Sequence, residues 1–192
     1  NPSPGLMIFG MIGGFILAIV TIFKKIWAPY TVSGYALLKG LALGGISRFF
    51  EMQYPGIVSQ AVFLTFGILA ALLLAYKSGL IKPTENFKLG VVAATGGIAF
   101  MYLISFIMSI FGSGLSIMNT ANTSLFSIGF SVFVVIIASL NLVLDFDFIE
   151  EGAEMVAPKY MEWYGAFGLL VTLIWLYLEI LRLLAKLQSR RN

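Results

Sequence analysis

The sequence of 192 residues contains no cysteine and no histidine. Without cysteine, the chain can form no disulfide framework and offers no thiolate as a nucleophile or a metal ligand. Without histidine, the chain cannot form a Ser-His-Asp catalytic site or a histidine-ligated zinc site, and it has no imidazole that could sense pH. A response to pH near neutrality would therefore depend on a carboxyl group with a raised pKa.

Charged residues are also scarce. They make up 11% of the chain, while 59% is hydrophobic; soluble domains have about 25% charged and about 45–50% apolar residues. This apolar excess cannot be buried in a water-soluble core of this size, so part of it must face lipid. The net charge is +3. Most of the basic residues flank apolar runs, which indicates orientation in a membrane rather than binding to nucleic acid.

Apolar runs long enough to cross a bilayer recur along the whole chain. A spanning helix needs roughly 20 mostly apolar residues. Six candidates meet this length, at about residues 5–23, 32–50, 57–76, 87–111, 124–144 and 163–184. The second is the weakest because it contains Lys39. We therefore predict an all-α, polytopic membrane helical bundle that forms a single transmembrane domain over residues 1–192, with the lipid bilayer as its first partner.

Local signals mark some ends and contacts of these helices. Tyr54-Pro55-Gly56 should break the chain between the second and third spans. Thr84 should be the N-cap of the fourth span. Gly40 and Gly44 form a small-xxx-small pair, and such pairs let helix backbones approach closely in lipid.

The sixth span contains charges near its centre. Glu179 and Arg182 are i, i+3 neighbours that can pair. On a helix they fall on one stripe with Thr172 and Lys186. The pair could serve only to let one helix carry both charges through lipid. We favour a role in ion or proton handling, because acids inside membrane spans are usually functional.

The fifth span has one small, polar face in an otherwise bulky apolar helix. Its members are Ser124, Ser127, Ser131, Val134, Ala138, Asn141 and Asp145. Such a stripe ending in a carboxylate is typical of either a water-lined or a helix-packing face. Asp147 points to the opposite side and is interpreted as a solvated residue at the membrane edge.

Four further carboxylates follow the fifth span. An acidic cluster near an interface could collect cations by Coulomb attraction. It lacks the alternating ligand pattern of an EF-hand calcium loop. A solvated loop is therefore the favoured interpretation for Glu150, Glu151, Glu154 and Glu162.

Two carboxyl-bearing segments together carry a resemblance to a known family. Residues 144–154 (LDFDFIEEGAE), followed by a last helix containing residues 176–182 (LYLEILR), resemble the carboxy-terminal signature of the Bax inhibitor-1 family. Residues 40–44 and Tyr54-Pro55 are similar to its early helices. The likeness covers most of the chain, and its nearest branch is the bacterial YccA-like one. It implies a multi-pass protein of the bacterial inner membrane.

The resemblance implies a fold of seven helices with the last in the centre, of which the first is absent from this sequence. It also implies a Ca²⁺ leak that pH opens and closes through a buried acid pair. Asp145 takes the place of the first acid and Glu179 that of the second, and Lys24 or Lys25 matches a basic residue tied to the pair. Ca²⁺ would be the permeant ion, held transiently by the two acids, with no resident cofactor. Two features depart from the family: a Glu where many relatives have Asp, and a longer loop between the acids.

A pH-sensitive calcium (cation) leak is therefore the predicted function. Two carboxyls held close in a low-dielectric place cannot both ionise easily. A shared proton would hold the fifth and sixth helices together, and its loss would open a pore lined by Ser127, Ser131, Asn141 and the acids. Arg182 would favour the ionised form.

The alternative is an interaction protein that regulates a membrane-bound ATP-dependent protease and modulates the stress response, with the acids in structural roles. An enzyme is not expected. No G-x-S-x-G element is present, and the two acids are not accompanied by the motifs of aspartyl intramembrane proteases.

Overall fold

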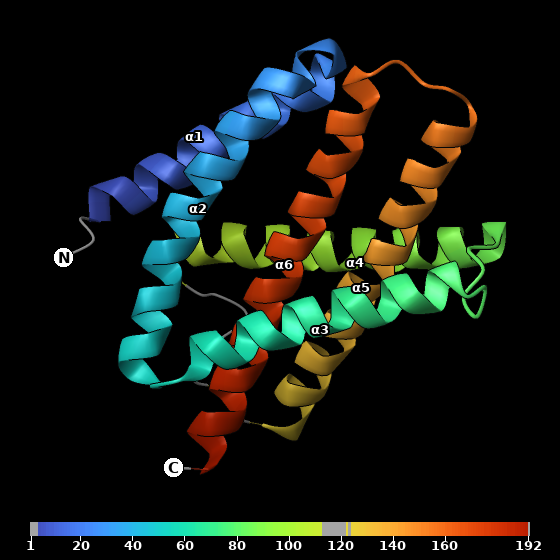
Figure 1. Cartoon of the computed structure of the whole chain (residues 1–192). Helices are drawn as coiled ribbons and strands as arrows, with labels where there is room; N and C mark the ends of the chain where they lie inside the picture. The colour runs from blue at the N-terminus through green and yellow to red at the C-terminus, as the bar shows by residue number, and fades with distance from the viewer. Residues whose placement is uncertain (1–3, 113–121, 123, 192) are drawn as a thin grey trace. The chain divides into compact units, whose positions relative to one another are not determined.

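The computed structural model describes residues 4–112, 122 and 124–191, and these residues are helical apart from short connections. Figure 1 shows the helices in chain order. They are α1 (Pro4–Phe23), the short 3₁₀ helix η1 (Lys25–Trp27), α2 (Ala28–Gln53), α3 (Ile57–Lys77), α4 (Glu85–Ile110), α5 (Leu125–Glu154) and α6 (Tyr160–Arg191). Each of the six predicted segments therefore lies on one of these α-helices, and α2, α5 and α6 extend beyond the predicted bounds. The seven-helix arrangement of the family, with its last helix central, stays an expectation.

The fifth span was predicted to end near residue 144, and a solvated loop was favoured for Glu150, Glu151 and Glu154. The loop prediction was wrong for these three residues, which are helical. Helix α5 continues for three more turns and ends at Glu154. The segment from residue 145 to residue 154 contains no proline, and its one glycine, Gly152, lies in the last turn, so nothing interrupts the helix before Glu154. The break comes at Val156, which has a positive φ of 49°, and at Pro158, which cannot continue a helix.

Five of the described helices are long and apolar enough to cross a membrane: α1, α3, α4, α5 and α6. Of the six predicted spans, the one on α2 does not meet this standard. Its 26 residues include Lys39, Arg48 and Glu51, which lower its hydropathy. On the apolar helices, large side chains such as Phe63 and Phe126 are exposed. Exposure of so many apolar side chains fits a lipid environment, and the protein is an integral multi-pass membrane protein.

The chain divides into two compact units. The first comprises residues 1–58 and 145–171, and the second comprises residues 59–144 and 172–192. Helices α3, α5 and α6 each contribute to both units. Each unit is described by itself below.

In the first unit, α1 and α2 form an antiparallel hairpin (Figure 1). A Cβ atom on Gly10 would lie 2.4 Å from the carbonyl oxygen of Leu38, so the two backbones approach closely at this point. Near the turn, the Thr21 hydroxyl donates to Thr31 Oγ1 at 2.7 Å. Gly40 and Gly44 have no such neighbour within 4 Å. The predicted contact at these two glycines was wrong, because the hairpin buries a different face of α2.

The turn between α2 and α3 is held by the side chain of Glu51. The predicted break lies here, and Gly56 adopts a positive φ of 85°. The two carboxylate oxygens of Glu51 accept hydrogen bonds from the backbone N–H groups of Gly56 (2.6 Å) and Val58 (3.1 Å). These bonds satisfy amide groups at the start of α3 and place a negative charge at the positive end of the helix dipole.

We expect Glu51→Ala to lower the free energy of unfolding by about 1–2 kcal/mol, the usual effect of losing a helix N-terminal cap. The loss should appear as a lower midpoint of thermal unfolding in detergent. Glu51→Gln is the matched control, because an amide keeps one acceptor oxygen but loses the charge. Its unfolding midpoint should lie between those of the wild type and Glu51→Ala. An unchanged midpoint for Glu51→Ala would show that water replaces the cap at no cost.

In the second unit, the predicted N-cap of α4 is confirmed. Thr84 accepts a hydrogen bond from the backbone N–H of Phe87 at 3.3 Å. Farther along, buried Ile98 of α4 packs with Val134 and Ile137 of α5, and Tyr102 and Trp175 border this cluster. The cluster thus positions two polar aromatic side chains next to the charged stripe of α6.

Candidate functional site: a buried polar network on helix α6

Helix α6 has a leucine-rich sequence with charges at positions 179, 182 and 186. The intervals of three and four residues place these charges on one side of the helix. That side is turned inward: Glu179 is 2% exposed and Lys186 is completely buried. All three charged residues belong to the second unit. The buried stripe predicted from the spacing is therefore confirmed as a structural feature.

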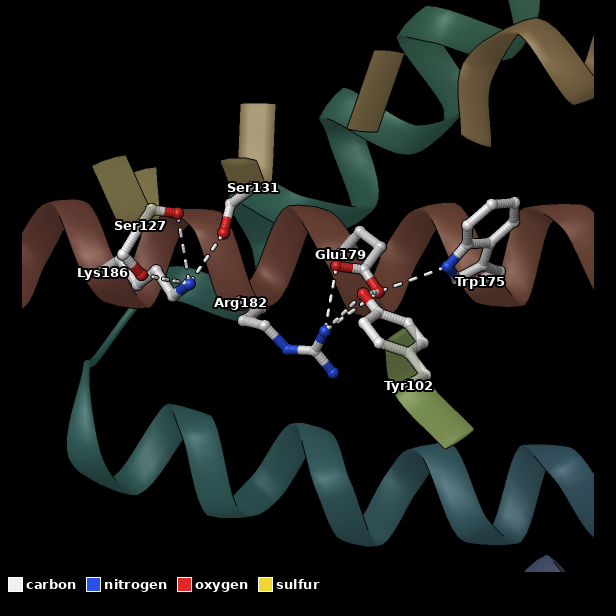
Figure 2. A network of polar contacts seen from close by, with 7 residues as sticks. All are labelled: Tyr102, Ser127, Ser131, Trp175, Glu179, Arg182 and Lys186. Atoms are coloured by element: carbon white, nitrogen blue, oxygen red, sulfur yellow. Dashed lines mark hydrogen bonds and ion pairs between the residues drawn. The ribbon is translucent and has the colours of Figure 1, made fainter. Parts of the chain in front are cut away.

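Proton donors surround the carboxylate of Glu179 (Figure 2). The phenol of Tyr102 on α4 donates a hydrogen bond to Oε1. The indole N–H of Trp175, one turn earlier on α6, donates to the same oxygen at 3.2 Å. The guanidinium of Arg182 donates to Oε1 at 3.0 Å and to Oε2 at 3.1 Å. Each of these contacts fits an ionised carboxylate, which only accepts hydrogen bonds.

The ion pair between Glu179 and Arg182 confirms the predicted i, i+3 pair. The Arg182 side chain is 30% exposed and that of Glu179 is 2% exposed, so the pair joins a buried acid to a half-buried base. Arg182 also donates to Tyr102 Oη at 2.8 Å, and its guanidinium lies 5.4 Å from the centre of the tyrosine ring. Two charges removed from water need such additional hydrogen bonds to offset their desolvation.

A second polar group lies one turn farther along α6. The ammonium of Lys186 donates to Ser127 Oγ at 2.8 Å, Ser131 Oγ at 2.9 Å and the Ser127 carbonyl oxygen at 3.4 Å (Figure 2). Sequence reasoning placed Lys186 on the stripe and the two serines on a polar face of α5, but it did not join them. One feature of the sequence could have predicted this contact: a lysine on the inward stripe of α6 needs hydrogen-bond acceptors, and the polar face of α5 offers hydroxyl oxygens.

The polar face of α5 is a helix-packing face in this structure. Ser127, Ser131, Val134 and Ala138 are all buried. Asn141 donates to Thr95 Oγ1 of α4 at 2.7 Å and to the Ile137 carbonyl oxygen at 2.8 Å. The space between this face and the charged stripe is too narrow to admit a water molecule; it is lined by Tyr102, Phe130, Ser131, Val134, Glu179, Arg182 and Lys186.

Asp145 belongs to the first unit and Glu179 to the second, and a contact between the two carboxyls stays a prediction. Within the first unit, Asp145 Oδ1 lies 3.2 Å from the position that a Cβ atom on Gly168 would take. The glycine therefore lets the backbone of α6 approach this half-buried carboxyl. Asp147 is also only partly exposed.

Lys24 and Lys25 are exposed residues of the first unit, between α1 and α2. The ammonium of Lys25 lies 4.9 Å from the centre of the Tyr164 ring on α6, which is a cation–π distance. The link from either lysine to the acid pair, implied by the family resemblance, stays a prediction.

The acidic residues that follow residue 149 are exposed side chains on two helix ends. Glu150, Glu151 and Glu154 lie on the last turns of α5, and Glu162 lies on the first turn of α6. Within the described parts of the chain, no three Asp or Glu side chains come together as a group that could hold a metal ion. Transient binding of Ca²⁺ by Asp145 and Glu179 is not tested by this observation.

Comparisons with known proteins give one match. A family model described as Bax inhibitor 1 like matches residues 1–189. No curated protein and no solved structure matches the chain. The family match covers both carboxyl-bearing segments and the whole described network on α6.

Proposed function

The chain belongs to the Bax inhibitor 1 like family, and we propose that it is a pH-sensitive calcium (cation) leak of a bacterial inner membrane, with Glu179 as a carboxyl of its gate. The observation that carries this proposal is the burial of Glu179 inside a membrane helix, where Arg182 and Tyr102 bind it. A buried acid of this kind is costly to maintain, and in membrane proteins it usually marks an ion or proton pathway.

The contacts of Glu179 support a direction for the pH response. Because Tyr102, Trp175 and Arg182 all donate to it, the ionised carboxylate ties α4 and α6 together. Uptake of a proton removes the attraction to Arg182 and turns one acceptor oxygen into a donor. Acid should therefore loosen the network. The sequence alone suggested that proton loss from a shared acid pair opens the pore; the surroundings of Glu179 favour proton uptake as the opening step for this residue.

Opening would require Arg182 to move. Its side chain is already 30% exposed, so after losing its partner it can leave the network instead of staying buried without a counter-charge. Separation of α4 from α6 would then uncover the oxygens of Ser131 and Asn141 on α5. A path lined by uncharged oxygens and reached past carboxylates favours cations over anions. Asp145 is the second carboxyl of this proposal, through the family resemblance.

The test is Ca²⁺ flux into proteoliposomes of the complete protein as a function of pH. We expect flux to rise as the pH falls, because proton uptake by Glu179 removes its attraction to Arg182. Glu179→Gln should give a flux that no longer depends on pH, because an amide cannot ionise. Asp145→Asn should also change the pH dependence if it is the second carboxyl.

Glu162→Gln is the matched control, because this exposed acid lies on the same helix outside the network, and it should behave as the wild type. A flux equal to that of empty liposomes at every pH would contradict the leak. It would leave the hypothesis of a protease-regulating interaction protein, in which Asp145 and Glu179 are structural.

A further inference from the structure

Lys186 is a fully buried cation that donates hydrogen bonds to three neutral oxygens of α5. The two serine hydroxyls lie 2.8 and 2.9 Å from its ammonium, and the carbonyl oxygen of Ser127 lies 3.4 Å from it. All three oxygens come from one turn of α5, and both serines are buried. This turn of the helix therefore presents a preformed group of oxygens to a positive charge.

Oxygens of this kind are suited to a monovalent cation. Hydroxyl and carbonyl oxygens can replace part of the hydration shell of K⁺ or Na⁺, as rings of carbonyls do in channel filters. Ca²⁺ in contrast takes six to eight oxygens and usually includes carboxylates. Ser127 and Ser131 contribute two hydroxyl oxygens and one carbonyl oxygen, and neutral oxygens of this kind are better suited to a monovalent cation.

We propose that Ser127 and Ser131 form a coordination site for a monovalent cation, and that the Lys186 ammonium occupies this site as a tethered competing cation. The inference rests on the proposed function, because it assumes that the cation pathway follows the polar face of α5. Lys186 is thus a second barrier on the same stripe as Glu179. Seven residues separate the two positions, about 10 Å along the helix axis. Release of Arg182 alone leaves the ammonium in the serine site, so Lys186 lowers the flux through the open path without abolishing it.

The absence of cysteine from the chain allows a reversible test of the tethered charge. In the Lys186→Cys variant the serine oxygens lose their ammonium. We expect K⁺ flux into proteoliposomes to rise severalfold at acid pH, where the proposed gate at Glu179 is open. An aminoethyl methanethiosulfonate reagent places a new ammonium on the introduced cysteine and should return the flux to the wild-type level. A methyl methanethiosulfonate reagent adds a neutral group and should leave the flux high.

Equal flux before and after the aminoethyl reagent would overturn the proposal, provided that labelling is complete by mass spectrometry. So would a Lys186→Cys flux no higher than that of the wild type. The matched control is Arg190→Cys, because Arg190 is exposed on the next turn of the same helix. Its flux should not respond to either reagent.

Binding of the cation can be measured without any flux. The thermal unfolding midpoint of Lys186→Met should rise by about 3 °C when K⁺ replaces N-methylglucamine at equal ionic strength, as expected for a ligand present at several times its dissociation constant. The wild type and the Lys186→Met/Ser131→Ala variant should show no rise. If the midpoint of Lys186→Met rises with K⁺ while neither the wild type nor any variant conducts Ca²⁺, the cation site is supported and the proposed calcium leak is contradicted. If the midpoint of Lys186→Met ignores K⁺, the site itself is refuted.

Discussion

The Arg182→Met variant should have a free energy of unfolding about 3–5 kcal/mol lower than that of the wild type. We expect this loss to be larger than the loss caused by replacing any exposed charged residue of this chain. The methionine approximates the length of the arginine stem but removes both guanidinium bonds to Glu179 and the bond to Tyr102. Glu179 would then be a buried carboxylate without its described positive partner. The measurement is thermal or denaturant unfolding in detergent at neutral pH.

The control for this prediction is the double variant Glu179→Gln/Arg182→Met. With the carboxylate also neutral, no uncompensated charge is left, so we expect the double variant to be more stable than Arg182→Met alone. The coupling between the two sites should be about 0.5–3 kcal/mol, the range for residues in one network. If the two single effects simply add, Arg182 stabilises the protein by packing, and the ion pair contributes nothing.

Much of the fold could be predicted because the positions of membrane helices depend on short stretches of sequence. The apolar runs, the break at Gly56 and the cap at Thr84 each depend on neighbours only a few residues away. The pairing of Glu179 with Arg182 is of the same kind, since it follows from a spacing of three on one helix.

The rest of the site depends on contacts across the chain that spacing cannot reveal. Tyr102 is 77 residues from Glu179, and Ser131 is 55 residues from Lys186. Neither partner can be chosen from periodicity, because several polar residues on α4 and α5 were equally available. Lys186 was therefore placed on the charged stripe of α6 but was not joined to the serines that bind it.

Glycine contacts show the same limit in the first unit. A small-xxx-small pair indicates that a helix can pack closely, but it does not tell which face will pack. On α2 the pair Gly40 and Gly44 lies open, while Gly45 contacts Met7 of α1. The closest approach of α1 to α2 is instead at a small residue of α1. This residue is Gly10, which faces Leu38 and Ala42 of α2.

Gly10→Ala should consequently destabilise the α1–α2 hairpin, whereas Gly40→Ala should not. The new methyl group at position 10 would lie 2.4 Å from a backbone oxygen and 3.0 Å from a backbone nitrogen of α2. Backbone cannot rotate away as a side chain can, so the helices must separate. We expect a loss of about 1–3 kcal/mol in the free energy of unfolding, the usual cost of overpacking. Thermal unfolding of the two variants, side by side in one detergent, measures the difference.

At position 40 the same substitution meets nothing within 4 Å. Alanine is the better helix former by about 0.8–1.0 kcal/mol, so Gly40→Ala should be neutral or more stable than the wild type. The opposite order, with Gly40→Ala the weaker variant, would mean that α2 packs through its Gly40–Gly44 face and that the hairpin register described here is wrong. Because both variants make one identical change on neighbouring helices, the comparison isolates the close approach of the two backbones from helix propensity.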